Sequence, residues 1–345
     1  ASNPIRAQQG TDMRTFRVVL VAMLCVCIHT SIVVHAQNDF THWETPHVSP
    51  ITLTPSGQLL LVVNTPDNRL EIFDTADDSL PWVASIPVGL DPVSVRCRGE
   101  TEAWVVNHVS DSISIIDLVD GRVVRTLLTG DEPADVVFAG NPQRAFVTVS
   151  QLNQVRVYDP DNLAAPPVIV NIRGEDPRAM AVSANGAYVF VAIFESSNAT
   201  TAIRQQEVSN PGGPYNGRNP PPNFGNVFNP PITPGLPPAP PVAHIVRRDA
   251  AGAWRDDNGR NWSQFVTWNL LDNDVAIIDA NTLDVRYAGG MLTTVMALGV
   301  RPDGAVTAVG TEARNEVRFE PNLSGRFLRV QMGSFQPQTP ATRSV

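Results

Sequence analysis

Short apolar runs separated by polar turn residues dominate the chain from Gln37 onward. In "AWVVNHVSDSISIID", Ala103 to Asp117, two such runs flank a polar tip. Apolar runs of this length, joined by Gly, Pro, Asn, Asp or Ser, are typical of β-hairpins. An apolar pattern with helical spacing is nowhere sustained beyond about ten residues. The pattern therefore predicts an all-β protein.

The same hairpin pattern returns along the chain and closes each time on an acidic residue. The closing residues are Asp74, Asp117, Asp159 and Asp279, with a weaker copy ending at Glu320. The first three aspartates lie 43 and 42 residues apart, whereas 120 residues separate Asp159 from Asp279. One unit, the fourth, is therefore expected to carry an insertion, at about residues 195–272.

Each unit contains enough apolar runs for four antiparallel strands, which is the signature of a β-propeller blade. A blade cannot bury both of its faces alone, so neighbouring blades must stack around an axis. We expect one β-propeller over residues 37–345. Its blades should cover about residues 47–91, 92–133, 134–177, 178–295 and 296–337.

The repeat resembles the YVTN β-propeller repeat of secreted and surface proteins. The residues that carry the resemblance are Trp104-Val105-Val106-Asn107 with Ile115-Ile116-Asp117, Val62-Val63-Asn64 with Ile72-Phe73-Asp74, and the turn Pro302-Asp303-Gly304. The resemblance implies a propeller, usually of seven blades, and implies little about activity, because such proteins include surface proteins, lactonases and haem-carrying reductase domains. About five blades fit the chain, so we expect a part of a longer ring, with a closed five-bladed ring and a ring completed by two chains as alternatives. An open ring would expose blade edges that can pair with another chain.

An apolar run near the start has the features of a secretory signal peptide. Arg14 and Arg17 precede the apolar core Val18 to Ile28, and Val34-His35-Ala36 fits a small-residue cleavage site. Residues 1–36 are therefore expected to be an upstream segment and a leader. The remaining chain should be exported, to the periplasm, the cell surface or the medium, with no transmembrane segment.

Composition narrows the class of partner. The formal charge is −9, and all 25 basic residues are arginine. A nucleic-acid-binding protein usually carries a basic face, so that class of partner is not expected.

In a propeller, the tips between second and third strands lie on the same face as the connections between blades. The repeat predicts these tips at Thr65 to Asn68, His108 to Asp111, Gln151 to Gln154 and Thr311 to Asn315. Three of these connections carry an acidic residue before proline: Asp91, Glu132 and Asp176. One explanation is local: an acidic residue before proline suits a turn in extended conformation, where its carboxylate accepts a hydrogen bond from a nearby backbone N–H. The alternative is a ring of carboxylates that holds Ca²⁺. His108, on a predicted tip, is a further candidate ligand-binding residue.

The insertion is expected to emerge on that same face. Twelve of the 30 prolines lie between Pro211 and Pro241, which favours irregular coil. The following segment is predicted to form a hairpin that turns near Ala250 to Gly252. It carries aromatic and short polar side chains that suit a sugar-binding surface: Trp254, Asp256, Asp257, Trp262 and Trp268. Alternatively, the tryptophans anchor the insertion on the propeller.

Familiar catalytic motifs are absent from the sequence. It contains no C-x-x-C-H, H-E-x-x-H, Walker loop or G-x-S-x-G pattern, so no catalytic residue is assigned. We expect an exported binding or scaffold module that presents the insertion-bearing face to a protein or a carbohydrate. The alternatives are a propeller hydrolase or oxidoreductase that uses the channel mouth, and a non-catalytic part of a larger enzyme or electron-transfer protein.

Overall fold

The computed structural model describes residues 45–220, 241–316 and 326–337. The expected leader, part of the proline-rich tract and the closing Glu320 lie outside the described residues. No helix in the described part of the chain is long and apolar enough to cross a membrane.

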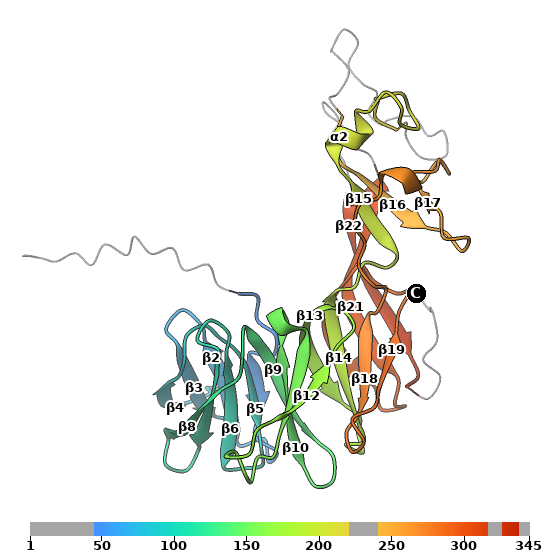
Figure 1. Ribbon diagram of the computed structural model, residues 1–345. Helices are drawn as coiled ribbons and strands as arrows, with labels where there is room; N and C mark the ends of the chain where they lie inside the picture. The colour runs from blue at the N-terminus through green and yellow to red at the C-terminus, as the bar shows by residue number, and fades with distance from the viewer. Residues whose placement is uncertain (1–44, 221–240, 317–325, 338–345) are drawn as a thin grey trace, which may run out of the picture. The chain divides into compact units, whose positions relative to one another are not determined.

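Strands of the first three blades form separate four-stranded antiparallel sheets in which neighbours in sequence are neighbours in space (Figure 1). Blade 1 contains β1 (Ile51–Leu53), β2 (Leu59–Asn64), β3 (Arg69–Asp74) and β4 (Trp82–Pro87). Blade 2 contains β5 (Pro92–Cys97), β6 (Glu102–Asn107), β7 (Ser112–Asp117) and β8 (Arg122–Leu128). Blade 3 contains β9 (Pro133–Ala139), β10 (Arg144–Val149), the short 3₁₀ helix η1 (Ser150–Leu152), β11 (Gln154–Tyr158) and β12 (Val168–Asn171).

Blades 4 and 5 are joined into one larger sheet at a single residue pair, Glu195 opposite Thr294. Blade 4 contains β13 (Glu175–Val182), β14 (Tyr188–Glu195), β18 (Val275–Asp279) and β19 (Val285–Ala288). Blade 5 contains β20 (Thr294–Val300), β21 (Val306–Glu316) and β22 (Arg326–Phe335).

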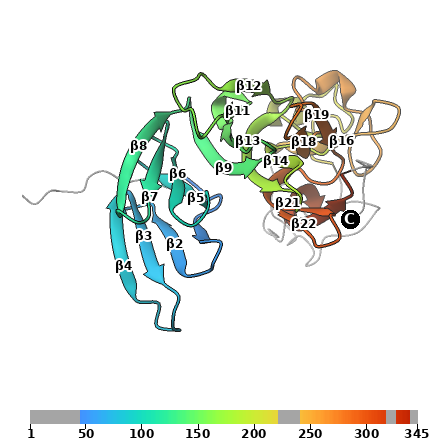
Figure 2. The same cartoon turned by 90° about the horizontal axis from the view of Figure 1, so that it is seen from below.

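The first strands of successive blades contact one another, β1 with β5, β5 with β9, β9 with β13 and β13 with β20. In Figure 2, β5, β9 and β13 lie side by side. Apolar clusters fill the space between successive blades; Val105, for example, packs with blade 1 residues, and Trp104 on the opposite face packs with blade 3 residues. An all-β propeller built from blades of this kind is thereby confirmed.

The closing aspartates occupy equivalent places, at the end of the third strand of each of the first four blades. Asp117 Oδ1 accepts the backbone N–H groups of Val119 and Asp120 at 2.8 and 2.9 Å, and Asp279 Oδ1 accepts those of Asn281 and Thr282 at 2.9 Å. These bonds lower the pKa of both carboxyl groups. The repeat in the sequence is thus a repeat of one side-chain-capped turn.

The fifth blade departs from the predicted pattern. A tip was expected at Thr311 to Asn315, but these residues lie inside β21, which runs on to Glu316. Thr311 pairs with both Thr294 and Val330, and Asn315 contacts the insertion. Tertiary pairing has extended the strand here beyond the length that the repeat predicts.

The insertion leaves the fourth blade after β14 and returns before β18, so it separates two strands that pair directly, with Ala192 opposite Val275. It contains its own three-stranded sheet, β15 (Thr200–Ile203), β16 (His244–Arg248) and β17 (Trp254–Arg255), with the short helices α2 (Gln205–Val208) and η3 (Ser263–Phe265). The predicted hairpin is present, because Arg248 pairs with Trp254 around a turn at Asp249 to Ala253. The insertion emerges at the end of the blades where the tips lie (Figure 1).

Candidate functional site

The loops at the insertion-bearing end of blades 1 to 4 are built by one repeated bond. We call them the tip face: residues 65–68, 89–91, 108–111, 130–132, 150–153 and 174–176. In blades 1, 2 and 3 a tip side chain accepts the backbone N–H of the connection to the next blade. Asn68 accepts from Asp91 at 2.8 Å, Asp111 from Glu132 at 3.0 Å and Asn153 from Asp176 at 2.9 Å. All six residues have a left-handed backbone, with φ between 52° and 57°.

The acidic residues before proline therefore differ from the expected extended turn. Each donates its N–H to the preceding tip, and this bond holds the left-handed conformation that proline usually disfavours in the residue before it. Asp91 is fully buried, Glu132 Oε2 accepts Gln151 Nε2 at 3.0 Å, and the Asp176 carboxylate lies 3.7 Å from Arg178. No group of three metal-ligating side chains comes together within the described ranges, so the predicted Ca²⁺ ring has no ligand cluster there.

His108 lies at the predicted tip but is almost fully buried, with 5% of its surface exposed. Its Nδ1 lies 3.0 Å from the carbonyl oxygen of Pro133, and its Nε2 lies 3.6 Å from the Glu132 carboxylate. The ring thus bridges the tip of blade 2 to the start of blade 3, which is a structural role.

The tip face combines negative charge with exposed apolar side chains. Its loops include seven carboxylates and no arginine of their own, although Asp91 is buried and Arg178 of β13 lies 3.7 Å from Asp176; the carboxylates are Asp67, Asp91, Asp111, Asp131, Glu132, Glu175 and Asp176. Leu90, Val109 and Leu152 are exposed by 52%, 54% and 42%. The first two belong to neighbouring loops, because the Leu90 N–H donates to Ser110 Oγ at 2.9 Å.

Two of the candidate sugar-stacking residues form the core of the insertion. Trp262 is fully buried and Trp254 is 8% exposed, and they pack with Ile203, Val208 and Val246. Asp256, 6% exposed, accepts the Trp262 indole N–H at 3.0 Å. A sugar cannot stack on rings that are enclosed in this way. Of the predicted set, Trp268 is half exposed and Asp257 is exposed.

An ion pair between a partly exposed arginine and a buried carboxylate connects the insertion to blade 5. Arg247 of β16 pairs with Glu312 of β21, and Asn198 donates to the same carboxylate at 2.6 Å. Beside them, Asn315 Oδ1 accepts the Ile245 N–H at 3.0 Å and Asn315 Nδ2 donates to the Ile245 carbonyl at 2.6 Å. These bonds fix β16 against β21.

The root of the insertion contains a buried carboxyl with an unusual pKa. Asp274 accepts the Ser196 hydroxyl at 2.6 Å and the N–H groups of Met291 and Leu292 at 2.8 and 3.1 Å. Burial raises the pKa of Asp274 to about 7 in spite of these donors. Next to Ser196, three consecutive residues, 197–199, have a left-handed backbone with φ of 70°, 46° and 53°. Such strain persists only where the surrounding structure enforces it.

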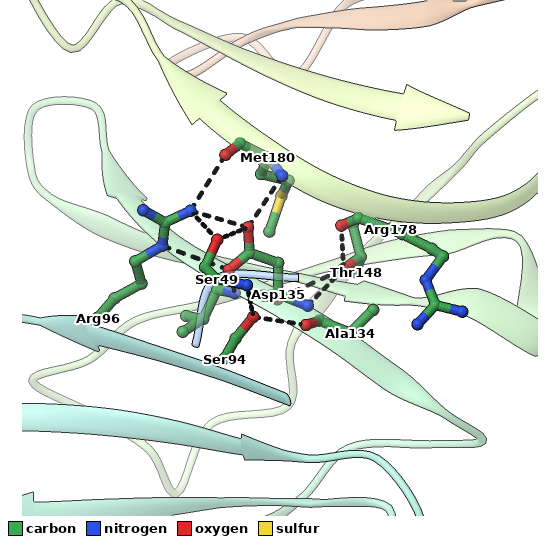
Figure 3. A network of polar contacts seen from close by, with 9 residues as sticks. Ser49, Ser94, Arg96, Ala134, Asp135, Thr148, Arg178 and Met180 are labelled. Atoms are coloured by element: carbon green, nitrogen blue, oxygen red, sulfur yellow. Dashed lines mark hydrogen bonds and ion pairs between the residues drawn. The ribbon is translucent and has the colours of Figure 1, made fainter. Parts of the chain in front are cut away.

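A second buried carboxyl lies where the first strands of four blades meet (Figure 3). Asp135 of β9, with a fully buried side chain, pairs with Arg96 of β5 at 3.0 Å. The same carboxylate accepts the Ser49 hydroxyl at 3.3 Å and the Met180 N–H at 2.9 Å. Its charge raises the pKa of Arg96. This axial network therefore ties blades 1, 2, 3 and 4 together.

Sequence analysis did not identify Asp135, Asp274 or Glu312. A signal for Asp135 exists, because a lone carboxylate inside "PADVVFA" interrupts an otherwise apolar strand. Asp274 and Glu312 stand in polar surroundings, so nothing in their neighbourhood distinguishes them from exposed residues. Their burial depends on how the insertion folds back.

Comparisons with known proteins support the architecture. No protein-family model matches the chain, and no curated protein does. Among solved structures, Kuenenia stuttgartiensis hydrazine synthase is similar at 14% identity with a TM-score of 0.54, over 87% of this chain and 66% of that one. A candidate 6-phosphogluconolactonase from Bacteroides uniformis is similar at 15% identity with a TM-score of 0.40, over 83% of this chain and 87% of that one. The chain thus spans about two thirds of the hydrazine synthase chain, and the likeness at this identity shows the fold alone.

Proposed function

We propose that the chain is an exported propeller module that binds a protein partner through its tip face. The observation that carries the proposal is the combination of an excess of carboxylates over arginines with three exposed apolar side chains, on loops that one repeated bond holds in place. Exposed apolar groups within a polar rim are typical of interaction sites.

Charge defines the kind of partner. A face with this excess of carboxylates attracts basic groups over several ångströms and repels acidic ones. Leu90, Val109 and Leu152 would add contact area that is lost from water on binding. The partner is therefore expected to present a segment that is both basic and apolar.

Order in the loops supports binding. Because Asn68, Asp111 and Asn153 fix the connections, little conformational entropy is lost when a partner docks. The insertion borders the same end of the blades, with Trp268 and Leu271 each 50% exposed. These two side chains are available to extend the contact surface.

The proposal is tested with synthetic peptides of matched length in which leucine alternates with lysine, glutamate or serine. We expect the full chain to bind the leucine-lysine peptide most tightly in biolayer interferometry, and about ten-fold more weakly when salt is raised from 50 to 300 mM, because the charges are screened.

Paired variants locate the site. Leu90→Ser with Val109→Ser should reduce affinity about ten-fold, as should Asp131→Ser with Glu175→Ser. The matched control is Leu80→Ser with Val119→Ser, because these side chains, 41% and 76% exposed, lie at the opposite end of the blades. Equal binding of the leucine-lysine and leucine-glutamate peptides, or an equal loss in the control, would overturn the proposal.

A further inference from the structure

A pocket that is open to solvent over much of its boundary lies at the end of the propeller axis opposite the tip face; we call it the axial cavity. Its volume is about 340 Å³, within the range of small-molecule sites. Its lining includes Leu53, Cys97, Phe138 and Val182. These residues occupy equivalent positions on the first strands of blades 1 to 4, opposite Leu60, Ala103, Ala145 and Val189 of the second strands. The cavity is thus built by the repeat itself.

Six of the nine lining side chains are apolar and three are polar, and polar atoms make up the larger part of the exposed lining surface. Pro55 and Val137 complete the apolar wall, and Arg96, Thr52 and Gln143 supply the polar groups. An apolar wall with a small number of placed polar groups is the usual composition of a small-molecule site.

The polar groups are mainly hydrogen-bond donors. Arg96 uses Nε and Nη2 for Asp135, which leaves Nη1 outside the bonds of the axial network. Arg98 donates to Gln143 Oε1 at 3.2 Å, so the amide N–H groups of Gln143 are the part of that side chain left to face a ligand. A ligand in this cavity must therefore offer an acceptor.

Charge around the cavity disfavours an anion. Asp135 neutralises Arg96, and Arg98 pairs with Glu102 and Asp161. Glu100 adds a further negative charge, which acts on Cys97. With both arginines compensated and two carboxylates in excess, an anionic ligand gains no net attraction.

We propose that this axial cavity binds a small neutral molecule that has an apolar body and a carbonyl oxygen as acceptor. The site goes beyond the partner-binding role of the tip face, because it lies at the other end of the axis. The Cys97 thiol forms part of its wall. Burial raises the pKa of that thiol to about 11, so it stays protonated near neutral pH and contacts the ligand without reacting.

Cys97 also provides a reporter for the test. Alkylation of Cys97 by iodoacetamide is followed in the full chain at pH 9, and mass spectrometry resolves the peptide with Cys97 from those with Cys25 and Cys27. The probes are acetophenone, benzoate and benzylamine, which are similar in size and differ in charge. We expect acetophenone at millimolar concentration to slow alkylation about five-fold with saturation, and benzoate to have less effect.

Two variants test whether protection of Cys97 comes from acetophenone bound in the axial cavity. Leu53→Trp fills the cavity at a side chain that is 52% exposed, and Gln143→Ala removes a donor from an exposed position. Both should abolish protection by acetophenone while leaving the melting temperature within about 2 °C. The matched control is Leu128→Trp on β8, where the side chain is 77% exposed and does not line the cavity.

The outcomes are decisive for the site. Protection that saturates in the unchanged protein and in the Leu128 variant, but not in the Leu53 variant, supports it. Alkylation of Cys97 at a rate that acetophenone does not change at any concentration shows that the cavity does not bind such a molecule, and this overturns the proposal. Stronger protection by benzoate than by acetophenone overturns the assigned ligand class.

Discussion

Asp135 and Asp274 are buried carboxyl groups that each accept hydrogen bonds from more than one strand or loop, and the groups around them differ in charge. Asp135 has a full counter-charge in Arg96 and further donors in Ser49 and Met180. Asp274 has only neutral donors, Ser196 and the N–H groups of Met291 and Leu292. A charge without a counter-charge is expensive to bury, so the two residues should respond differently to substitution and to pH.

Replacing Asp135 should strongly destabilise the propeller. Asp135→Ala leaves Arg96 with its charge partner removed at the meeting point of four blades. We expect a loss of about 3–5 kcal/mol in the free energy of unfolding, measured by urea denaturation. Arg122→Ala is the control, because the Arg122–Asp120 pair is more than half exposed on both sides and is worth less than about 1 kcal/mol. Similar losses in both variants would contradict the role assigned to the axial network.

Asp274 should make stability depend on pH. Its pKa is raised from 3.8 to about 7 on folding, so the folded protein holds this proton more tightly than the unfolded chain does. The resulting contribution to stability is complete below pH 3.8 and is lost as the pH rises through about 7. Between pH 5 and pH 8 this residue should lower the free energy of unfolding by about 2–3 kcal/mol.

Asp274→Asn isolates that effect. The amide cannot titrate, and it also loses an acceptor for one of the two N–H groups, so the variant carries a cost that is the same at every pH. The expected result is a flatter dependence of the unfolding free energy on pH between 5 and 8, measured by urea denaturation. Parallel curves for the variant and the unchanged protein would show that the carboxyl is ionised throughout.

At the scale of elements, the insertion has the features of a small domain attached to a hairpin. β14 and β18 pair from Tyr188–Asp279 to Ala192–Val275 as if the insertion were absent. Trp254 and Trp262 give it a core of its own. Its contact with blade 5, however, buries Glu312 beside Arg247 and Asn198. Removing the insertion would leave this carboxylate without its partner.

A deletion can test this description. Replacing residues 197–273 by the dipeptide Asn-Gly should permit a tight hairpin between β14 and β18. We expect the deletion to destabilise the propeller, and Glu312→Gln to destabilise the full chain but not the deleted one, because the deletion removes Arg247 and exposes the carboxylate to water. Thermal melting followed by circular dichroism measures both. A deletion that melts like the full chain, with no effect of Glu312→Gln, would mean that the insertion does not stabilise blade 5.

The sequence predicts an element correctly when the interactions that form it lie between residues close together in the chain. Asp117 and its equivalents were identified because the side chain caps the turn that follows it, within three residues. Thr311 to Asn315 were misassigned because these residues continue β21 by pairing with β22 and also contact β16, and the repeat pattern shows neither contact. Trp262 was predicted to lie on a sugar-binding surface for a similar reason. Only the fold of the insertion shows that Ile203 and Val246 enclose its ring.

At the scale of the whole molecule, blades 1 and 5 each expose one sheet face. The equivalent faces of blades 2, 3 and 4 are covered by a neighbouring blade. On blade 1, Leu53, Leu60, Phe73 and Trp82 lie opposite one another across the four strands, and Leu53 and Trp82 are 52% and 62% exposed. On blade 5, Val330 and Met332 are 85% and 61% exposed. In blade 2, by contrast, Trp104 is fully buried against blade 3.

These faces should cause the chain to self-associate. Contiguous exposed apolar surface favours association, and the strand edges add unpaired backbone donors and acceptors. We expect sedimentation velocity to show concentration-dependent association of the full chain, and Trp82→Ser with Val330→Ser to reduce it. The two substitutions should leave the free energy of unfolding within about 1 kcal/mol, since both side chains are largely exposed. The control is Val119→Ser, which is 76% exposed in the turn between β7 and β8 and away from both faces. The exposed faces of blades 1 and 5 are chemically equivalent to the faces that pack against one another between blades, so two copies should pack through them. A chain that sediments as a single species at every concentration would show that exposed apolar surface alone does not bring these faces together.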